Sequence, residues 1–173
     1  IIGGNHRMSA MAASLLLPQF QTIEHDMRTR DKNRQKLDQA LSEMGLEVTH
    51  RYKNVSRESN HLYLLRYKAE NFNNISRESF FNAMRAEGVY TYAGYKPLYR
   101  EDIFQGKGND FPWLKKINYS NISCPVTEQI ADYQSIWLTQ NHLLGDESDI
   151  NDIINAFEKV IMTLNNHPEK FDN

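Results

Sequence analysis

A glycine-rich segment near the start of the chain carries side chains suited to binding an anion. It reads Gly3-Gly4-Asn5-His6-Arg7. Glycines let a backbone come close to a ligand, an asparagine amide donates hydrogen bonds, and a guanidinium can form two parallel bonds to an oxyanion such as phosphate. The same residues also make an ordinary turn. Taken alone, the segment leaves an anion site and a plain turn both open.

A second segment, residues 90–100, is rich in tyrosine and suits contact with a sugar-like ring. Its sequence is YTYAGYKPLYR. Tyrosine offers a flat apolar face and a polar tip, which are the features a ligand pocket uses to hold a ring and fix its orientation. Aromatic strand ends also occur where side chains simply pack together. On composition alone, packing is the favoured reading.

Residues that form metal sites or nucleophiles do not fall at the spacings these sites need. No histidine pair has the His-Glu-x-x-His pattern of a zinc helix. Cys124 is the single cysteine, and a lone cysteine is more often a small buried hydrophobe than a nucleophile. We therefore predict no metal and no catalytic residue among these side chains. The histidines are His6, His25, His50, His61, His142 and His167.

Composition indicates an ordinary globular protein whose partners are not chosen by net charge. The 173 residues are 40% hydrophobic and carry a formal charge of -2. The run Arg28 to Lys36 is basic, but at about 100° per residue its charges scatter around a helix, so a solvated surface is preferred to nucleic-acid binding. No apolar run approaches the ~20 residues that span a bilayer. We expect a cytoplasmic protein with neither a membrane nor a nucleic-acid partner.

A long helix must follow the glycine-rich segment. Ser9 is a suitable N-cap, and an amphipathic pattern then runs to Met44 with one interruption at Pro18. Such a helix spans roughly 54 Å, against about 40 Å for a compact chain of this size. It should therefore project from its domain or bridge to another. Arg30 and Arg34 interrupt its apolar seam, which indicates a polar site, a gap between domains, or plain solvent exposure.

The remaining chain predicts an α+β domain with a small, mostly antiparallel sheet covered by helices. Its turn residues and hydrophobic periods separate strands from helices. A long irregular loop runs from Ala93 to about Tyr119, and loops of that length usually have a function. The predicted strands are 46–50, 61–67, 89–92 and 135–138, and the predicted helices begin at Ser76, Pro125 and Glu147.

Read in order, these segments resemble the C-terminal part of the DegT/DnrJ/EryC1/StrS aminotransferases, sugar aminotransferases of the fold type I pyridoxal-phosphate enzymes. GGNHRM is similar to the family's Gly-x-Asn-Tyr-Arg-Met segment. His61-Leu62-Tyr63 matches its His-x-Tyr strand, GYKPLYR its Tyr-x-Pro-Leu-His loop, and CPVTE its Cys-Pro-Val-Ala-Glu segment. Tyr99 replaces the more frequent histidine, His6 replaces a tyrosine, and Pro18 stands in a helix that is normally proline-free.

The resemblance implies a homodimer with shared active sites and pyridoxal 5'-phosphate at the subunit interface. Asn5 and Arg7 would bind the cofactor and the anionic group of substrate or amino donor. Tyr95, Tyr99 and His61 would contact the substrate. Residues 1–44 would form the cofactor-contacting loop and bridging helix, 45–165 the α+β small domain, and 166–173 a frayed tail.

The lysine that forms a Schiff base with the cofactor in this family has no counterpart in the chain. The family places it upstream of the Gly-x-Asn segment, and the surroundings of Lys96 do not resemble it. We therefore expect a C-terminal fragment that is inactive alone, from an enzyme that aminates a keto-sugar or keto-cyclitol with glutamate or glutamine. The contexts of Tyr99 and Trp137 lean toward the branch acting on keto-cyclitols or aminohydroxybenzoate precursors. The alternative is a free-standing, non-catalytic binding or regulatory module.

Overall fold

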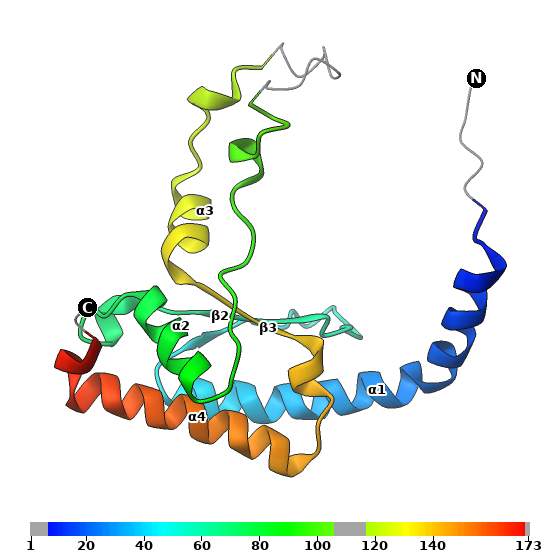
Figure 1. Ribbon diagram of the computed structural model, residues 1–173, viewed down its shortest axis with the longest axis horizontal. Coiled ribbons are helices and arrows are strands. Elements are labelled where there is room, and N and C mark those ends of the chain that lie inside the picture. The colour runs from blue at the N-terminus through cyan, green and yellow to red at the C-terminus, as the bar shows by residue number, and fades with distance from the viewer. Residues whose placement is uncertain (1–6, 106–116, 172–173) are drawn as a thin grey trace.

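The computed structural model describes residues 7–105 and 117–171, and it confirms the α+β class (Figure 1). Short 3₁₀ turns join the main elements. In the described ranges the main helices are α1 (Ala10–Glu43), α2 (Arg77–Ala86), α3 (Pro125–Gln129) and α4 (Glu147–Asn166), and the strands are β1 (Glu47–Val48), β2 (Leu62–Arg66) and β3 (Ser135–Thr139).

The strands form an antiparallel sheet in the order β1-β2-β3. Side chains alternate between its two faces, because successive residues of a strand point to opposite sides. Tyr63 and Leu65 of β2 are buried with Ile136 and Leu138 of β3 on the face that helices cover. Trp137, which pairs with Leu64, belongs to the opposite face. We call this opposite side the outer face.

The predicted strand over Val89–Tyr92 is wrong. This segment makes a single antiparallel bridge, in which Tyr92 exchanges backbone hydrogen bonds of 3.0 and 2.7 Å with Trp137. The chain then turns away at Gly94, whose φ of 85° lies in the left-handed region that favours glycine. Pairing beyond one residue is therefore prevented by the turn.

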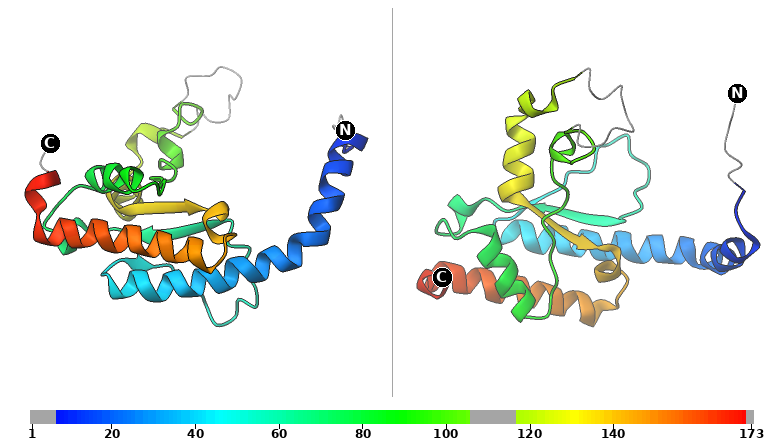
Figure 2. Two further views of the ribbon diagram at one scale, coloured as in Figure 1. Left: turned by 60° about the horizontal axis from the view of Figure 1, so that its bottom comes forward. Right: turned by 45° about the horizontal axis from the view of Figure 1, so that its top comes forward.

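Helices α1, α2 and α4 pack beneath the sheet, and α3 rises from the other side (Figures 1 and 2). The core joins the second half of α1 to the apolar stripe of α4 and to the buried sheet face. α4 begins at an Asp146 capping box, which satisfies its first backbone N–H groups. The fully buried members of the core include Leu37, Leu41, Phe80, Phe157 and Leu164.

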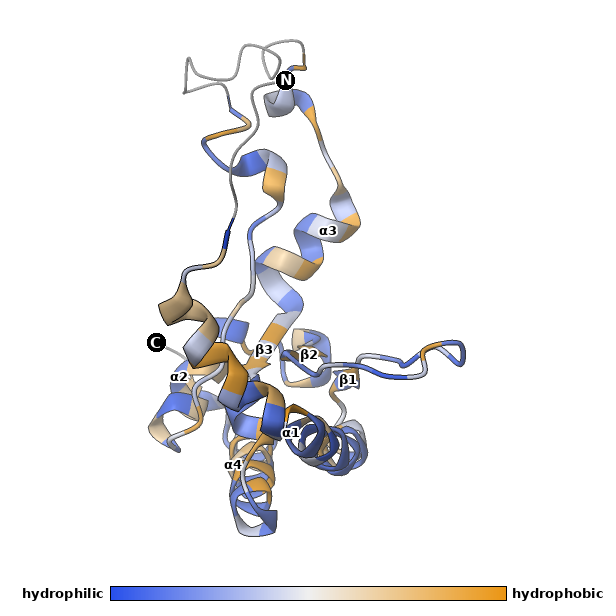
Figure 3. Cartoon of the chain, turned by 90° about the vertical axis from the view of Figure 1, so that its right-hand side faces the viewer, coloured by the Kyte–Doolittle hydropathy of each residue, from blue (hydrophilic) through white to orange (hydrophobic). Residues whose placement is uncertain are grey.

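The first half of α1 leaves this core. Figures 1 and 2 show the helix extending past the sheet and then curving away, in the part that contains Pro18, where the ring removes a backbone hydrogen bond. Orange segments mark apolar residues along this stretch in Figure 3. Met11, Leu15, Leu17 and Phe20 are all exposed there. No helix in the described part of the chain has both the length and the apolarity to span a lipid bilayer.

Arg30 and Arg34 in the seam of α1 are buried, so plain solvent exposure is excluded as the reason for them. Arg34 donates to Glu58, to Asn60 at 3.0 Å and to the Thr49 carbonyl at 2.9 Å. Arg30 donates to Gln140 at 2.8 Å. The two arginines therefore form polar sites inside this domain, which tie α1 to the segment before β2 and to the turn after β3.

The chain beyond α4 forms a 3₁₀ turn, Pro168–Phe171, where we expected a frayed tail. The ring of Phe171 is partly buried against the core. This apolar contact stabilises the turn, and the sequence pattern alone did not predict it.

Candidate functional site

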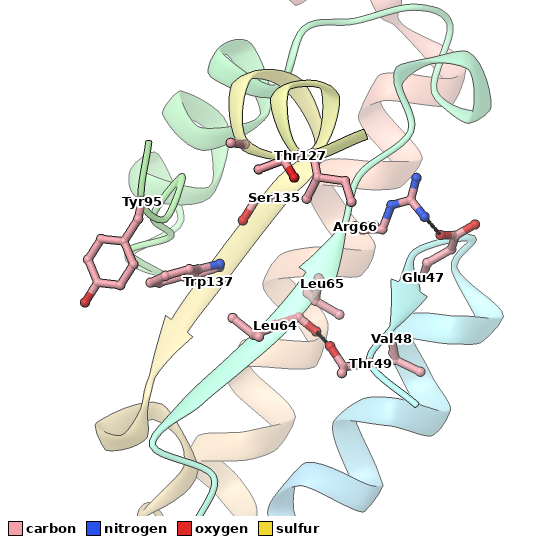
Figure 4. A pocket seen from close by; sticks show the side chains of 12 residues that line it. Glu47, Val48, Thr49, Leu64, Leu65, Arg66, Tyr95, Thr127, Ser135 and Trp137 are labelled. Carbon is pink, nitrogen blue, oxygen red and sulfur yellow. Dashed lines mark hydrogen bonds and ion pairs between the residues drawn. The ribbon is translucent and has the colours of Figure 1, made fainter. Parts of the chain in front are cut away.

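A hollow of about 570 Å³ lies on the outer face of the sheet (Figure 4). This volume is within the range of small-molecule sites, which usually combine apolar walls with a few polar groups. We call it the outer hollow. Its lining combines apolar, aromatic, hydroxyl and charged side chains. They come from the three strands, from α3 and the turn after it, and from the loop that contains Gly94, and they include Leu64, Ile130, Tyr95, Trp137, Thr127, Ser135, Glu47 and Arg66.

One wall of the outer hollow is an aromatic corner made by Trp137 and Tyr95. Their rings meet edge to face, with centroids 4.8 Å apart. Gly94 lies directly against the indole, because a Cβ placed on it would come within 2.5 Å of Trp137 Cε2. A glycine is therefore required here both for the close approach and for the positive φ. The predicted substrate residue Tyr95 does line a cavity, and three quarters of its surface stays exposed.

The opposite wall carries an ion pair between Glu47 and Arg66, whose atoms are 3.2 Å apart. Figure 4 shows the two side chains pointing toward each other at the edge of the sheet. A hydrogen bond from Lys68, followed by the charge of Arg66, holds the pKa of Glu47 below its usual range. Arg66 also donates to Gln134 at 2.7 Å. Glu47 therefore stays a carboxylate at neutral pH, and Arg66 is a bound cation.

A π-helical turn, Ile130–Gln134, joins α3 to β3 beside the outer hollow. Such turns are rare and often occur at functional sites. Arg77 of α2 holds this turn, because it donates to the carbonyls of Ala131 at 3.0 Å, Asp132 at 2.8 Å and Ser135 at 3.1 Å. Desolvation lowers the pKa of Arg77, which remains a cation over the Phe81 ring. The turn thus fixes how β3 presents Trp137.

The substrate candidate Tyr99 lies in what we call the arm, residues 93–105 and 117–124, which rises beside α3 (Figure 1). Its hydroxyl donates to the Glu128 carboxylate, which also accepts the Cys124 backbone N–H at 2.9 Å. Arg100 holds both oxygens of Asp132 at 3.0 and 2.8 Å. We call these contacts the clasp. It joins the arm to α3 and the π turn.

The clasp perturbs the ionisation of the groups that form it. Hydrogen bonds from Tyr99 and the Cys124 backbone lower the pKa of Glu128. Burial first, and then the bond to Glu128, raise the pKa of Tyr99. The phenol of Tyr99 is therefore a neutral donor whose acceptor lies inside the clasp.

His61 lies at a second hollow of about 340 Å³, next to Arg34, Glu58 and Asn60. Thr49 and Leu64 line both hollows, so His61 and Tyr95 flank one stretch of the outer face. Each of these two predicted residues thus lines a depression on the same side of the sheet.

Arg7 lies apart from the tyrosines. It precedes the N-terminal end of α1, which Figure 1 shows at the far end of the helix from the sheet. Its side chain is exposed and has no hydrogen bond or ion pair within residues 7–105 and 117–171. Asn5 lies outside the described residues. One copy of the chain therefore does not bring Arg7 and the outer face into a single site.

The sequence pattern did not single out most of the outer hollow. Trp137 stands between Ile136 and Leu138 in an apolar run, so strand alternation was the available indication that it faces the other way. Glu47, Arg66 and Ser135 carried no motif, and Thr127 lies in the CPVTE segment but was not proposed as a contact. They come together through strand register and the π turn, which single-residue patterns do not encode.

The family model described as the DegT/DnrJ/EryC1/StrS aminotransferase family matches residues 1–158. Among curated relatives, an L-glutamine:2-deoxy-scyllo-inosose aminotransferase of Micromonospora echinospora is 28% identical over 172 residues, 98% of this chain and 40% of its own length. A protein of the same name from Streptomyces paromomycinus is 25% identical over 167 residues, 93% of this chain and 39% of its own. The chain thus spans about two fifths of these relatives.

Solved structures show the same fold. An aminotransferase from Psychrobacter cryohalolentis superposes with a TM-score of 0.76 at 20% identity, covering 96% of this chain and 42% of that one. A 3-amino-5-hydroxybenzoic acid synthase superposes with a TM-score of 0.70 at 20% identity, covering 94% and 41%. The similarity again extends over a part of each larger chain.

Proposed function

Because the chain belongs to the DegT/DnrJ/EryC1/StrS aminotransferase family, we propose that it is the C-terminal part of a pyridoxal-phosphate-dependent enzyme that aminates a keto-cyclitol with glutamine. The match over residues 1–158 carries this proposal. Relatives named for glutamine and 2-deoxy-scyllo-inosose support the donor and the substrate class.

The outer face supports a role in holding the ring of the substrate. Tyr95 and Trp137 provide flat apolar surfaces, and hydroxyl groups lie within the same hollow. We place Tyr95 and His61 at the substrate. Tyr99 would act through the clasp, by holding the arm that carries Tyr95.

The N-terminal end of α1 fits the phosphate of the cofactor. The exposed Arg7 guanidinium lies two residues before the Ser9 N-cap, and the first turn of the helix has no acidic residue. The end of a 34-residue helix adds partial positive charge there. Arg7 and Asn5 would bind the cofactor phosphate. The chemistry that pyridoxal phosphate supplies when bound is transfer of an amino group from a donor to a ketone.

A homodimer explains why Arg7 and the outer face lie apart in one copy. Each active site would take Asn5 and Arg7 from one subunit and the substrate contacts from the other. The exposed apolar side chains in the first half of α1 suit burial against another protein surface. The Schiff-base lysine would come from a larger domain, so the chain alone would not catalyse transamination.

The test uses the longer protein that contains this chain, purified with its cofactor. We expect it to convert 2-deoxy-scyllo-inosose and glutamine to an amine. Asn5→Ala should lose bound cofactor more readily on dilution, measured by cofactor absorbance after gel filtration. The control is Gln21→Ala, at an exposed position of α1 away from the glycine-rich segment. Full cofactor retention in Asn5→Ala would reject its assigned role.

The coding sequence upstream of Ile1 decides between this enzyme and a non-catalytic module with the same fold. An upstream large domain with the family's lysine supports the enzyme. A reading frame that opens at or just before Ile1 supports the module instead.

A further inference from the structure

Three polar groups on the walls of the outer hollow have no internal partner. Within the described residues, no hydrogen bond engages the hydroxyls of Thr127 and Ser135 or the indole N–H of Trp137. Ser135 is only 8% exposed, but its hydroxyl oxygen still reaches solvent at the hollow, where it can bond a ligand. The indole nitrogen lies on the side of the ring toward the hollow (Figure 4). These groups can therefore serve a ligand.

The charge of the lining discriminates between ligand classes. Its one acid and one base, Glu47 and Arg66, already form an ion pair. A phosphate would need an uncommitted cation or a cluster of backbone N–H groups to replace its hydration. The lining offers hydroxyls, an indole N–H and apolar surface instead. These groups suit an uncharged ring that carries several hydroxyls.

We infer that the outer hollow is a recognition site for an uncharged, polyhydroxylated six-membered ring, and that it selects against sugars linked to a nucleoside diphosphate. Trp137 and Tyr95 face the ring, while Thr127, Ser135 and the indole N–H bond its hydroxyls. Gly94 is needed because any side chain there would displace the indole. This inference rests on the proposed function for the identity of the ring, and it adds the residues that determine specificity.

Binding is tested on the full 173-residue chain with scyllo-inositol as the uncharged probe and UDP-glucose as the charged one. The indole N–H resonance of Trp137 in a ¹H–¹⁵N spectrum reports on the hollow directly. We expect a saturable shift with scyllo-inositol and a much weaker response to UDP-glucose. No shift with scyllo-inositol, or equal or tighter binding of UDP-glucose, overturns the inference.

Variants separate the hollow from the fold around it. Thr127→Val on exposed α3 and Ser135→Ala each remove a hydroxyl, and we expect binding to weaken about three- to tenfold, the range for loss of one hydrogen bond. Tyr133→Phe is the control, because Tyr133 is exposed on the π turn and does not line the hollow. Unchanged affinity in both hydroxyl variants, with native spectra, overturns the inference.

The longer enzyme distinguishes failure here from failure of the proposed function. If it aminates a keto-cyclitol but Thr127→Val and Ser135→Ala leave KM unchanged, the hollow is not the ring site and the function stands. If the chain binds scyllo-inositol but the enzyme does not aminate keto-cyclitols, the hollow stands and the function fails.

Discussion

Helix α1 runs through two environments, and the contrast separates what stabilises this chain from what it presents to other molecules. In the second half, Leu37 and Leu41 are completely buried against α4 and the sheet. In the first half, Leu17 is 66% and Phe20 65% exposed. Both halves carry apolar residues at helical spacing, and the first half is the more apolar of the two. The halves differ in whether the described chain offers a surface that covers those residues.

An amphipathic pattern therefore predicts that one face of a helix is covered, but it does not identify the surface that covers it. The second half finds its partner within the described chain. The first half points its apolar side chains outward, as expected for a surface that meets another protein. Stability should therefore depend on the second half, and assembly on the first.

The largest expected effect comes from truncating one leucine in each half. Leu41→Ala leaves a cavity in the core and should lower the free energy of unfolding by about 3 kcal/mol. Leu17→Ala removes an exposed side chain and should change it by about 0.5 kcal/mol or less. Urea unfolding followed by circular dichroism measures both. Equal losses would show that the first half is also buried in solution.

Next in size is the arginine that links the buried half of α1 to the segment before β2. Arg34→Met should lower the free energy of unfolding by about 2 kcal/mol, because Glu58 and Asn60 lose their partner in a mostly enclosed site. The control is Lys36→Met on the same helix. Its pair with Glu147 is solvent-exposed and is worth less than about 1 kcal/mol. A loss in Arg34→Met no larger than in Lys36→Met would contradict this role.

Lowering the pH should protonate Glu128 and break the clasp. We expect this to change the arm and no other part of the chain. The pKa of Glu128 is lowered because its ionised carboxylate accepts the hydrogen bonds of the clasp. The clasp is therefore complete above the ordinary carboxyl pKa of 4.5 and is lost as pH falls through the lowered value. The backbone N–H resonance of Cys124 should follow this titration. Glu128→Gln should abolish it, whereas Glu70→Gln, at an exposed site, should leave it intact.

The sequence predicted the elements better than their environments. The cap at Ser9 and the helix starts at Pro125 and Glu147 follow local rules, because each is set by a few neighbouring residues. The missing strand after Val89 and the buried arginines depend on contacts between distant segments. A local sequence pattern does not predict which residue of a distant segment will contact a given side chain.

The residues of the candidate site also divide into those that a local motif predicts and those that depend on contacts between distant segments. Tyr95 could be proposed from a motif, and the structure places it at a hollow. Tyr99 belongs to the same motif, yet its hydroxyl bonds Glu128, 29 positions further along the chain. The context of Trp137 pointed to a branch of the family but not to a contact in the site, because the residue lies in an apolar strand. The register of β2 and β3 shows that its side chain is on the outer face.

The smallest effect at neutral pH concerns Tyr63, on the sheet face that packs beside Asp38 of α1. Its hydroxyl is buried without a hydrogen-bond partner in the described structure, so Tyr63→Phe should change stability at pH 7 by about 0.5 kcal/mol or less. Burial, and then the charge of Asp38, raise the pKa of Tyr63 above its ordinary value of 10.0.

Because the pKa of Tyr63 is raised, the stability contributed by the buried half of α1 and its partners depends on pH in the alkaline range, whereas that of the exposed half does not. The folded chain holds the Tyr63 proton more tightly than the unfolded chain, so stability is complete below pH 10.0 and falls as pH rises beyond it. Tyr63→Phe should reduce this fall. Tyr67, whose pKa burial also raises, accounts for part of the slope that remains. Urea midpoints between about pH 8 and 11 measure the effect, and exposed Tyr133→Phe should keep the full wild-type slope. An identical slope in Tyr63→Phe would mean that solvent reaches this phenol before unfolding.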